Sequence, residues 1–242
     1  MITADKPISL RGLAVGFSGA VPERKYWTEV AQDRSILEFV AQLAGLTIKY
    51  GGRVVHGAHP TFTPILLRQA ELQGAGTAEL DVTICMSALW SKNLRSFESE
   101  RFAKSSKFIV VPQVGEGDPS NEAVRNASLT AMRRVLINEM SVLVAVGGMR
   151  HEGTGLIPGV AEEVALAQKR GLACFVVGGL GGEAAQVAEK FKLDPHSLRN
   201  GLSREKNSEL LSSDNIAACV SIVFEHLAQN RDLFAQQLPA LD

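Results

Sequence analysis

The sequence predicts an α/β fold: a Rossmann-like domain with a mostly parallel central sheet and helices on both faces. Short apolar runs that resemble strands alternate with longer stretches of helical periodicity. Two of these runs, "SVLVAVGG" and "ACFVVGG", carry no charged residue, which is typical of parallel strands buried on both faces. No internal repeat or linker interrupts the pattern, so we expect residues 1–242 to form a single domain.

Each expected element has a local signal. The apolar runs predict strands at residues 13–21, 53–58, 81–90, 107–114, 141–148 and 173–179. Helical spacing predicts helices at residues 36–52, 63–73, 120–140 and 213–230, and a further helix that begins near Gly159. Ser120 and Asp214 stand near two helix starts, and Gly51-Gly52 ends the first helix. The polar stretch 194–213 is short enough for an ordered excursion.

Composition restricts the partners and the compartment. The net charge of −1 gives no bulk attraction for nucleic acid or an anionic membrane. No apolar run approaches the roughly 20 residues that cross a bilayer, and the N-terminus lacks the apolar core of a signal peptide. Cys85, Cys174 and Cys219 lie far apart in apolar surroundings, as reduced core thiols do. We therefore expect a cytoplasmic protein without a bound metal or cofactor.

Four predicted strand ends carry unusual residues at the edge where open parallel sheets bind ligands. They are Gly16, Ser18 and Gly19; His56 and His59; Gly147 and Gly148; and Gly178, Gly179, Gly181 and Gly182. Glycine lets the backbone approach a ligand closely, but it also serves in tight turns. The histidines fit a loop role or ligand contact better than a metal pair, because no third metal ligand is obvious.

The strongest signal runs from Ser141 to Gly171, "SVLVAVGGMRHEGTGLIPGVAEEVALAQKRG". Gly159 and Val160 lie at a helix start, where free N–H groups and the helix dipole favour a phosphate. Glu162 and Glu163 follow in the first turn. They either complement the dipole, hold ribose hydroxyls, or stabilise a cation-like anomeric carbon during cleavage of an N-glycosidic bond.

The segment "AVGGMRHEGTGLIPGVAEEVALA" resembles the SLOG superfamily, named for the Smf/DprA proteins and the LOG cytokinin-activating phosphoribohydrolases. LOG enzymes carry Pro-Gly-Gly-x-Gly-Thr-x-x-Glu. Gly147-Gly148 match its glycine pair, and Gly159–Glu163 match its end, which places Glu163 on the family's catalytic glutamate. The stretch "MRRVLINEM" is similar to the preceding LOG helix, so Arg133 or Arg134 would match the functional arginine.

The sequence departs from LOG in three places. Val146 replaces the motif proline, Val160 replaces the threonine, and ten residues, "MRHEGTGLIP", separate two parts that one residue separates in LOG. The match is therefore to the nucleotide-binding scheme of the superfamily, over roughly residues 10–190. The "GGLGG" and "HGAHP" segments look more like stand-alone or TIR-associated SLOG domains of prokaryotic conflict systems, such as anti-phage signalling. That resemblance implies a sensor of nucleotide-derived signals.

Two functions follow from the resemblance. The first is binding of a nucleotide or NAD-derived ligand, such as ADP-ribose or cyclic ADP-ribose, with phosphates on the glycine loops and Glu163 on a ribose. The alternative is a nucleotide N-glycosidase, in which Glu163 stabilises the cation-like centre and Arg133 or Arg134 binds the phosphate. Binding of DNA is disfavoured, because no basic stripe accompanies the site.

Two further expectations concern assembly and the ten-residue bridge. The predicted helices at 120–140 and 213–230 are apolar over more of their circumference than one sheet face requires. Related SLOG domains also resemble dimers or tetramers, so we expect a homo-oligomer. The bridge at residues 149–158 is expected to enlarge the pocket or to cover it, which would suit a ligand of dinucleotide size.

Overall fold

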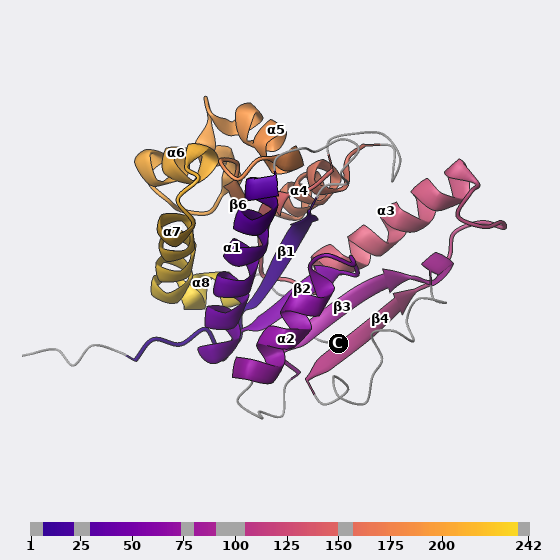
Figure 1. Cartoon of the computed structure of the whole chain (residues 1–242), viewed down its shortest axis with the longest axis horizontal. Coiled ribbons are helices and arrows are strands. Elements are labelled where there is room, and N and C mark those ends of the chain that lie inside the picture. The colour runs from indigo at the N-terminus through magenta and orange to yellow at the C-terminus, as the bar shows by residue number, and fades with distance from the viewer. Residues whose placement is uncertain (1–6, 22–29, 74–79, 91–104, 150–156, 237–242) are drawn as a thin grey trace, which may run out of the picture.

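A computed structural model describes residues 7–21, 30–73, 80–90, 105–149 and 157–236. Within these ranges one parallel sheet of six strands runs in the order β4-β3-β2-β1-β5-β6 (Figure 1). The strands are β1 (Ala14–Ala20), β2 (Arg53–Gly57), β3 (Val82–Ser87), β4 (Ser106–Val111), β5 (Val142–Gly147) and β6 (Ala173–Val177). The predicted α/β class is confirmed, and the sheet is parallel in every pairing described.

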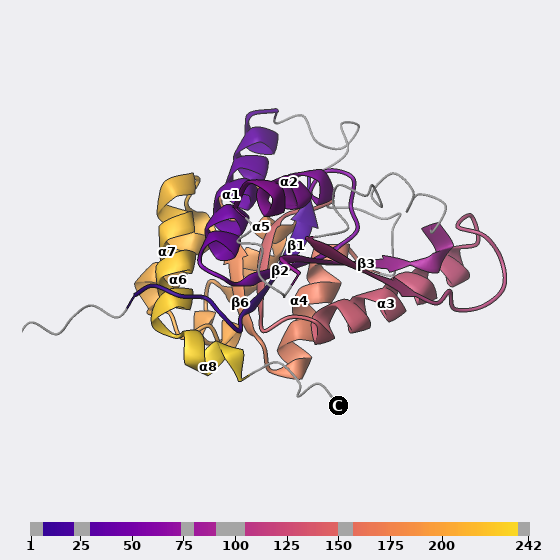
Figure 2. The same cartoon turned by 90° about the horizontal axis from the view of Figure 1, so that it is seen from below.

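Helices cover both faces of the sheet, as the sequence predicts. The helices are α1 (Val30–Lys49), α2 (Thr63–Gln73), α3 (Glu122–Asn138), α4 (Gly159–Arg170), α5 (Gly182–Phe191), α6 (Arg204–Ser212), α7 (Ile216–Gln229) and α8 (Arg231–Ala235), with the 3₁₀ turn η2 at Pro195–Leu198. Figure 2 shows α1 and α2 on one side of the sheet and α3 and α4 on the other. Each side has its own apolar cluster, so both sheet faces are buried, as a parallel sheet requires.

The order of the strands creates a switch point beside β1. From β1 the chain builds the sheet outward through β2, β3 and β4, and then returns through α3 to place β5 on the other side of β1. The register brings Ala20, at the end of β1, opposite Gly147, at the end of β5. Ligands of open α/β sheets bind in the crevice outside the carboxyl ends of two such strands.

Two helix starts differ from the sequence prediction by one residue. The cap of α3 is Asn121, whose side chain accepts from the backbone N–H groups of Ala123 and Val124. Ser120 instead donates its hydroxyl to Asp118 at 2.5 Å. Similarly, Asn215 and not Asp214 caps α7. The short Asn side chain reaches the free N–H groups of the first turn from this position.

The polar stretch 194–213 is an ordered excursion, as expected, and it contains η2 and α6. Asn200 anchors it, because its amide donates to the backbone oxygen of Cys174 on β6 at 2.9 Å and to Asn207 at 2.8 Å. All three cysteines are buried and free. Among the described residues, no helix combines the length and apolarity needed to cross a membrane.

Candidate functional site

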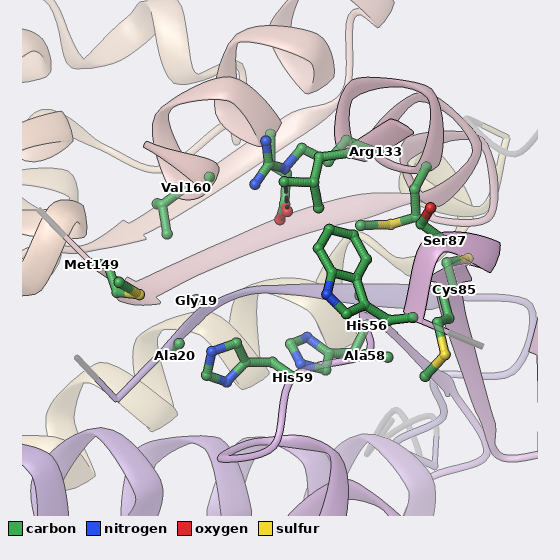
Figure 3. A pocket seen from close by; sticks show the side chains of 18 of the residues that line it. Gly19, Ala20, His56, Ala58, His59, Cys85, Ser87, Arg133, Met149 and Val160 are labelled. Carbon is green, nitrogen blue, oxygen red and sulfur yellow. Dashed lines mark ion pairs between the residues drawn. The ribbon is translucent and has the colours of Figure 1, made fainter. Parts of the chain in front are cut away.

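A pocket of about 530 Å³ lies at the carboxyl ends of β1, β2, β3 and β5 (Figure 3). The described residues that line it include Gly19, Ala20, His56, His59, Cys85, Met86, Ser87, Trp90, Leu129, Met132, Arg133, Gly148, Met149, Gly159, Val160 and Glu163. The volume lies in the range of roughly 300–1,000 Å³ that holds small molecules. Since β1 and β5 flank the switch point, the pocket occupies the crevice that the topology predicts.

The pocket has an apolar interior and a few polar groups. Met86, Trp90 and Met132 are among its apolar lining, and two imidazoles and one ion-paired cluster supply most of the polar side chains. Figure 3 shows His56 and His59 on one side of the space and Arg133 and Val160 on the opposite side. Apolar walls with convergent polar groups are typical of sites that bind organic ligands.

Helix α4 starts at the pocket without a side-chain cap. Pro158 precedes Gly159, and the first helical bond described runs from the N–H of Glu162 to the oxygen of Pro158 at 3.0 Å. The N–H groups of the residues before Glu162 have no acceptor within the helix, and the positive end of the helix dipole lies beside them. Gly159 and Val160 both line the pocket, so this uncapped turn is open to an anion.

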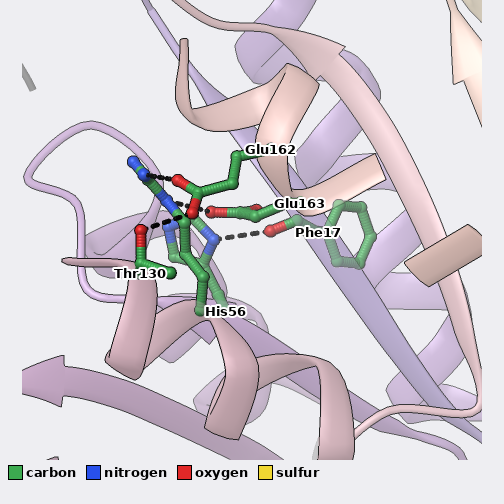
Figure 4. A network of polar contacts seen from close by, with 6 residues as sticks. Phe17, His56, Thr130, Glu162 and Glu163 are labelled. Atoms are coloured by element: carbon green, nitrogen blue, oxygen red, sulfur yellow. Dashed lines mark hydrogen bonds and ion pairs between the residues drawn. The ribbon is translucent and has the colours of Figure 1, made fainter. Parts of the chain in front are cut away.

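An ion-paired cluster joins α3 to α4 (Figure 4). Nη1 of Arg133 pairs with Glu162, and Nε of Arg133 lies 3.5 Å from Oε1 of Glu163. The hydroxyl of Thr130 donates to Glu162 at 2.5 Å. Arg133 is only 5% exposed, which means that its charge depends on these carboxylates for stabilisation.

The position of Gly159 leaves little room for a side chain, because Arg133 lies against it. A Cβ added at Gly159 would stand 2.7 Å from Nη2 of Arg133, closer than any ordinary contact. The guanidinium thus packs directly on the backbone where α4 begins. This contact fixes the position of the uncapped turn relative to α3.

The structure decides between the two neighbouring arginines. Arg133 lines the pocket, whereas Arg134 is exposed to solvent. Adjacent helical residues point about 100° apart, so only one of the pair faces α4. The proposed alternative role of Arg134 on a phosphate is therefore corrected: Arg134 does not belong to this pocket.

Glu163 is a buried carboxylate in the pocket wall. Burial raises its pKa, and the Arg133 charge and the Ser18 hydroxyl oppose that rise. Ser18 is fully buried and does not line the pocket. Of these two predicted site residues, only Glu163 is positioned to touch a ligand.

The two histidines differ in their surroundings. His56 is 2% exposed, and its Nδ1 lies 2.8 Å from the backbone oxygen of Phe17. His59 is half-buried, and its Nδ1 lies 2.9 Å from the hydroxyl of Thr61. Both histidines line the pocket, so the structure favours ligand contact over the loop role that the sequence left open for them. The signal for His56 was its place at the end of a strand.

The chain matches the family model described as SLOG cluster2 over residues 33–218. It belongs to the SLOG cluster2 family. The match includes β2 to β6 and the α3–α4 cluster, and it confirms the SLOG resemblance drawn from the glycine-rich segment. The association with stand-alone or TIR-linked members stays a prediction.

The chain is also similar to solved structures. One is the X-ray structure of a protein named TM1055, 14% identical, covering 88% of this chain and 99% of that one, with a TM-score of 0.49. Another is the molybdenum cofactor carrier protein from Chlamydomonas reinhardtii, 18% identical, covering 90% and 99%, with a TM-score of 0.49. A search of curated proteins found no match.

Several glycines do not contact the pocket, although the sequence predicts that they bind a ligand. In this SLOG protein they pack against the protein backbone. A Cβ on Gly178 or Gly179 would overlap the carbonyl oxygens of Leu211 and Ser213 near the end of α6. A Cβ on Gly182 would stand 2.5 Å from the backbone of Gly147. The loop after β6, including Gly181, does not line the pocket, so we do not include it in the proposed site.

Three glycines at the β1–β5 crevice have distinct positions. Gly19 and Gly148 line the pocket, as the sequence suggests. Gly147 has φ +64°, and a Cβ there would stand 2.6 Å from the oxygen of Ala20, so it permits close strand ends. Gly16 lies within the sheet, where an added Cβ would overlap Met140, and it makes no contribution to the pocket wall.

Gly179→Ala tests the packing role of the loop after β6. We expect the free energy of unfolding to fall by about 1–3 kcal/mol, because the methyl group overlaps the backbone beside α6. Urea denaturation measures the change. Gly57→Ala is the control, since its Cβ would meet nothing closer than 3.4 Å. Equal stability of Gly179→Ala and wild type would contradict the packing role.

Parts of the sequence prediction lie outside the described residues. Most of the bridge after Gly148 is among them, since residues 150–156 are not described, so the expected lid stays a prediction. Across the described ranges, His, Cys, Asp and Glu form no group of three or more that could hold a metal.

Burial raises the pKa of Cys85 to about 12, so this pocket thiol is protonated at neutral pH.

Proposed function

We propose that this SLOG protein binds a phosphorylated nucleoside in the pocket at the switch point. The observation that carries the proposal is the uncapped start of α4, which faces the same pocket as the buried carboxylate of Glu163. A helix N-terminus attracts a phosphate, and a carboxylate accepts hydrogen bonds from ribose hydroxyls. These two features lie one helical turn apart, so a phosphate and its ribose can reach both.

The apolar lining suits the base. Met86, Trp90 and Met132 offer the flat and flexible contacts that a heterocyclic ring needs, and the net charge of −1 makes a long polyanion a poor partner. We therefore do not propose DNA. The finer proposal, an NAD-derived ligand such as ADP-ribose or cyclic ADP-ribose in anti-phage signalling, rests on the SLOG resemblance. Homo-oligomerisation likewise stays a prediction.

Isothermal titration with adenosine, AMP, ADP-ribose and cyclic ADP-ribose tests the proposal. We expect phosphorylated ligands to bind more tightly than adenosine, because only they use the α4 start. Ala161→Asp places a negative charge in that turn. It should lower the affinity for phosphorylated ligands by about tenfold or more, with little effect on the affinity for adenosine. Ala165→Asp, one turn further along α4 and exposed, is the matched control. Adenosine binding as tightly as every phosphorylated form would refute the phosphate site.

Hydrolysis of an N-glycosidic bond is the second candidate, favoured by the position of Glu163 in the pocket wall. We expect Glu163→Gln to weaken ligand binding by roughly 1–2 kcal/mol through a poorer ribose hydrogen bond. We expect wild type to release no free base, as chromatography of the titrated nucleotides can check. Release of base that Glu163→Gln slows by about 100-fold, with binding retained, would establish the hydrolase instead.

A further inference from the structure

The second ring nitrogen of His56 is a buried polar atom at the pocket. His56 is 2% exposed, and among the described residues its Nε2 has no hydrogen-bond partner. A buried polar atom without a partner destabilises the protein, and such atoms are rare in native structures. Because His56 is one of the residues that line the pocket, a bound ligand is the natural source of the missing partner.

Geometry fixes the hydrogen-bonding role of this nitrogen. The backbone oxygen of Phe17 can only accept, so Nδ1 of His56 must carry the proton of the 2.8 Å bond between them. Burial lowers the pKa of His56 to about 4, and His59 contributes in the same direction. The ring is therefore neutral at pH 7, and Nε2 presents a lone pair that accepts hydrogen bonds.

The ring of His56 is held in place by its neighbours. It packs against Phe62, with ring centroids 5.4 Å apart, and the bond to Phe17 fixes its rotation. Nε2 is thus a rigidly held acceptor, and a fixed acceptor distinguishes an N–H group from an apolar edge.

The sheet separates His56 from the proposed phosphate site. His56 on β2 pairs with Phe17 on β1, and Phe17 pairs with Val144 on β5. Two strand spacings amount to about 10 Å. Helix α4 packs on β1, β5 and β6, so its start lies on the β5 side of the pocket. A group that reaches His56 from there belongs to the far edge of a base, and a purine extends further than a pyrimidine.

We propose that Nε2 of His56 accepts a hydrogen bond from an N–H group of a purine base, and that this bond selects the ligand. The inference rests on the proposed function, because it assumes a nucleotide with its phosphate at α4. The donor is either the amino group of an adenine-type base or the ring N–H of a hypoxanthine- or guanine-type base. His56 binds and discriminates; it takes no part in bond cleavage.

Three probes test this inference: AMP, which has the amino group; inosine monophosphate, which has the ring N–H; and purine riboside monophosphate, which has neither. We expect wild type to bind AMP or inosine monophosphate about tenfold or more tightly than purine riboside monophosphate. Whichever of the two binds more tightly identifies the donor. This comparison needs no mutation, so it stays valid if a variant fails to fold.

Variants assign the discrimination to His56. In His56→Phe, which keeps an aromatic ring but lacks the acceptor, the preference should fall below about threefold. His56→Gln restores an acceptor and should recover part of the preference. Thr83→Val, a change to a buried β3 residue that does not line the pocket, should leave it unchanged. Circular dichroism confirms that each variant is folded.

The outcomes separate this inference from the proposed function. If wild type binds the three probes equally, or a folded His56→Phe keeps the full preference, the inference is wrong while the nucleotide site stands. Tight binding of UMP or CMP without binding of any purine probe would also overturn it. If no phosphorylated nucleoside binds at all, the proposed function fails, and the inference fails with it.

Discussion

Arg133→Met is expected to lower the free energy of unfolding by about 3–5 kcal/mol, the range for breaking a buried ion pair from one side. The substitution removes the guanidinium that lies between Glu162 and Glu163 and leaves two carboxylates facing each other with little solvent around them. Met retains most of the apolar length of Arg, so the loss reports charge more than volume. Urea denaturation at pH 7 measures it.

Two companion variants make the Arg133 result interpretable. Arg134→Met changes the adjacent but exposed residue, and it should alter the free energy of unfolding by less than about 0.5 kcal/mol. Combining Arg133→Met with Glu162→Gln removes one of the stranded charges and should recover part of the lost stability. A loss below about 1 kcal/mol for Arg133→Met would mean that solvent already stabilises this cluster.

The same cluster revises the role that the resemblance gives to the arginine. Arg133 is shared by two carboxylates and packs on Gly159, so its charge is already compensated within the protein. This supports a positioning role, in which Arg133 holds Glu163 and the start of α4 in place. The N–H groups of α4, and not the guanidinium, are then the first candidates for a phosphate.

The elements that sequence alone predicts well are those set by local patterns. The run Val142–Gly147 is uncharged and proves to be fully buried, and the Pro158-Gly159 step does begin a helix at the pocket. Parallel pairing and helices on both faces follow from such runs, because a strand without polar residues must be covered twice. The predicted strand ends therefore indicate the position of the site from the sequence alone.

Contacts between distant segments are what the sequence does not reveal. In the sequence, the glycines Gly178 and Gly179 look the same whether they bind a phosphate or allow another backbone segment to pass closely. In this structure the backbone near the end of α6 passes close to them. The choice between Arg133 and Arg134 depends on the rotation of α3 against α4. The hydrogen bond from His56 to the backbone oxygen of Phe17 depends on the register between the neighbouring strands β2 and β1.

The stability of the protein should depend on His56 as the pH falls. In the unfolded chain His56 titrates near the ordinary histidine pKa of 6.5, whereas burial lowers the folded pKa to about 4. Between these values the unfolded state binds a proton that the native state does not, so acid favours unfolding. A difference of this size corresponds to about 3 kcal/mol of stability, present above pH 6.5 and lost progressively as the pH falls to 4.

Comparison with His56→Gln isolates this contribution from the other titrating groups. Gln does not titrate, so the difference in free energy of unfolding between wild type and His56→Gln should shrink by about 3 kcal/mol from pH 7 to pH 4. Glu163, whose raised pKa acts in the opposite direction, is present in both proteins and largely cancels. His226→Gln is the control, because it leaves His56 in place and should preserve most of the wild-type slope. A constant difference between wild type and His56→Gln across this range would mean that the native pKa of His56 stays near 6.5, which would contradict the burial of a neutral ring.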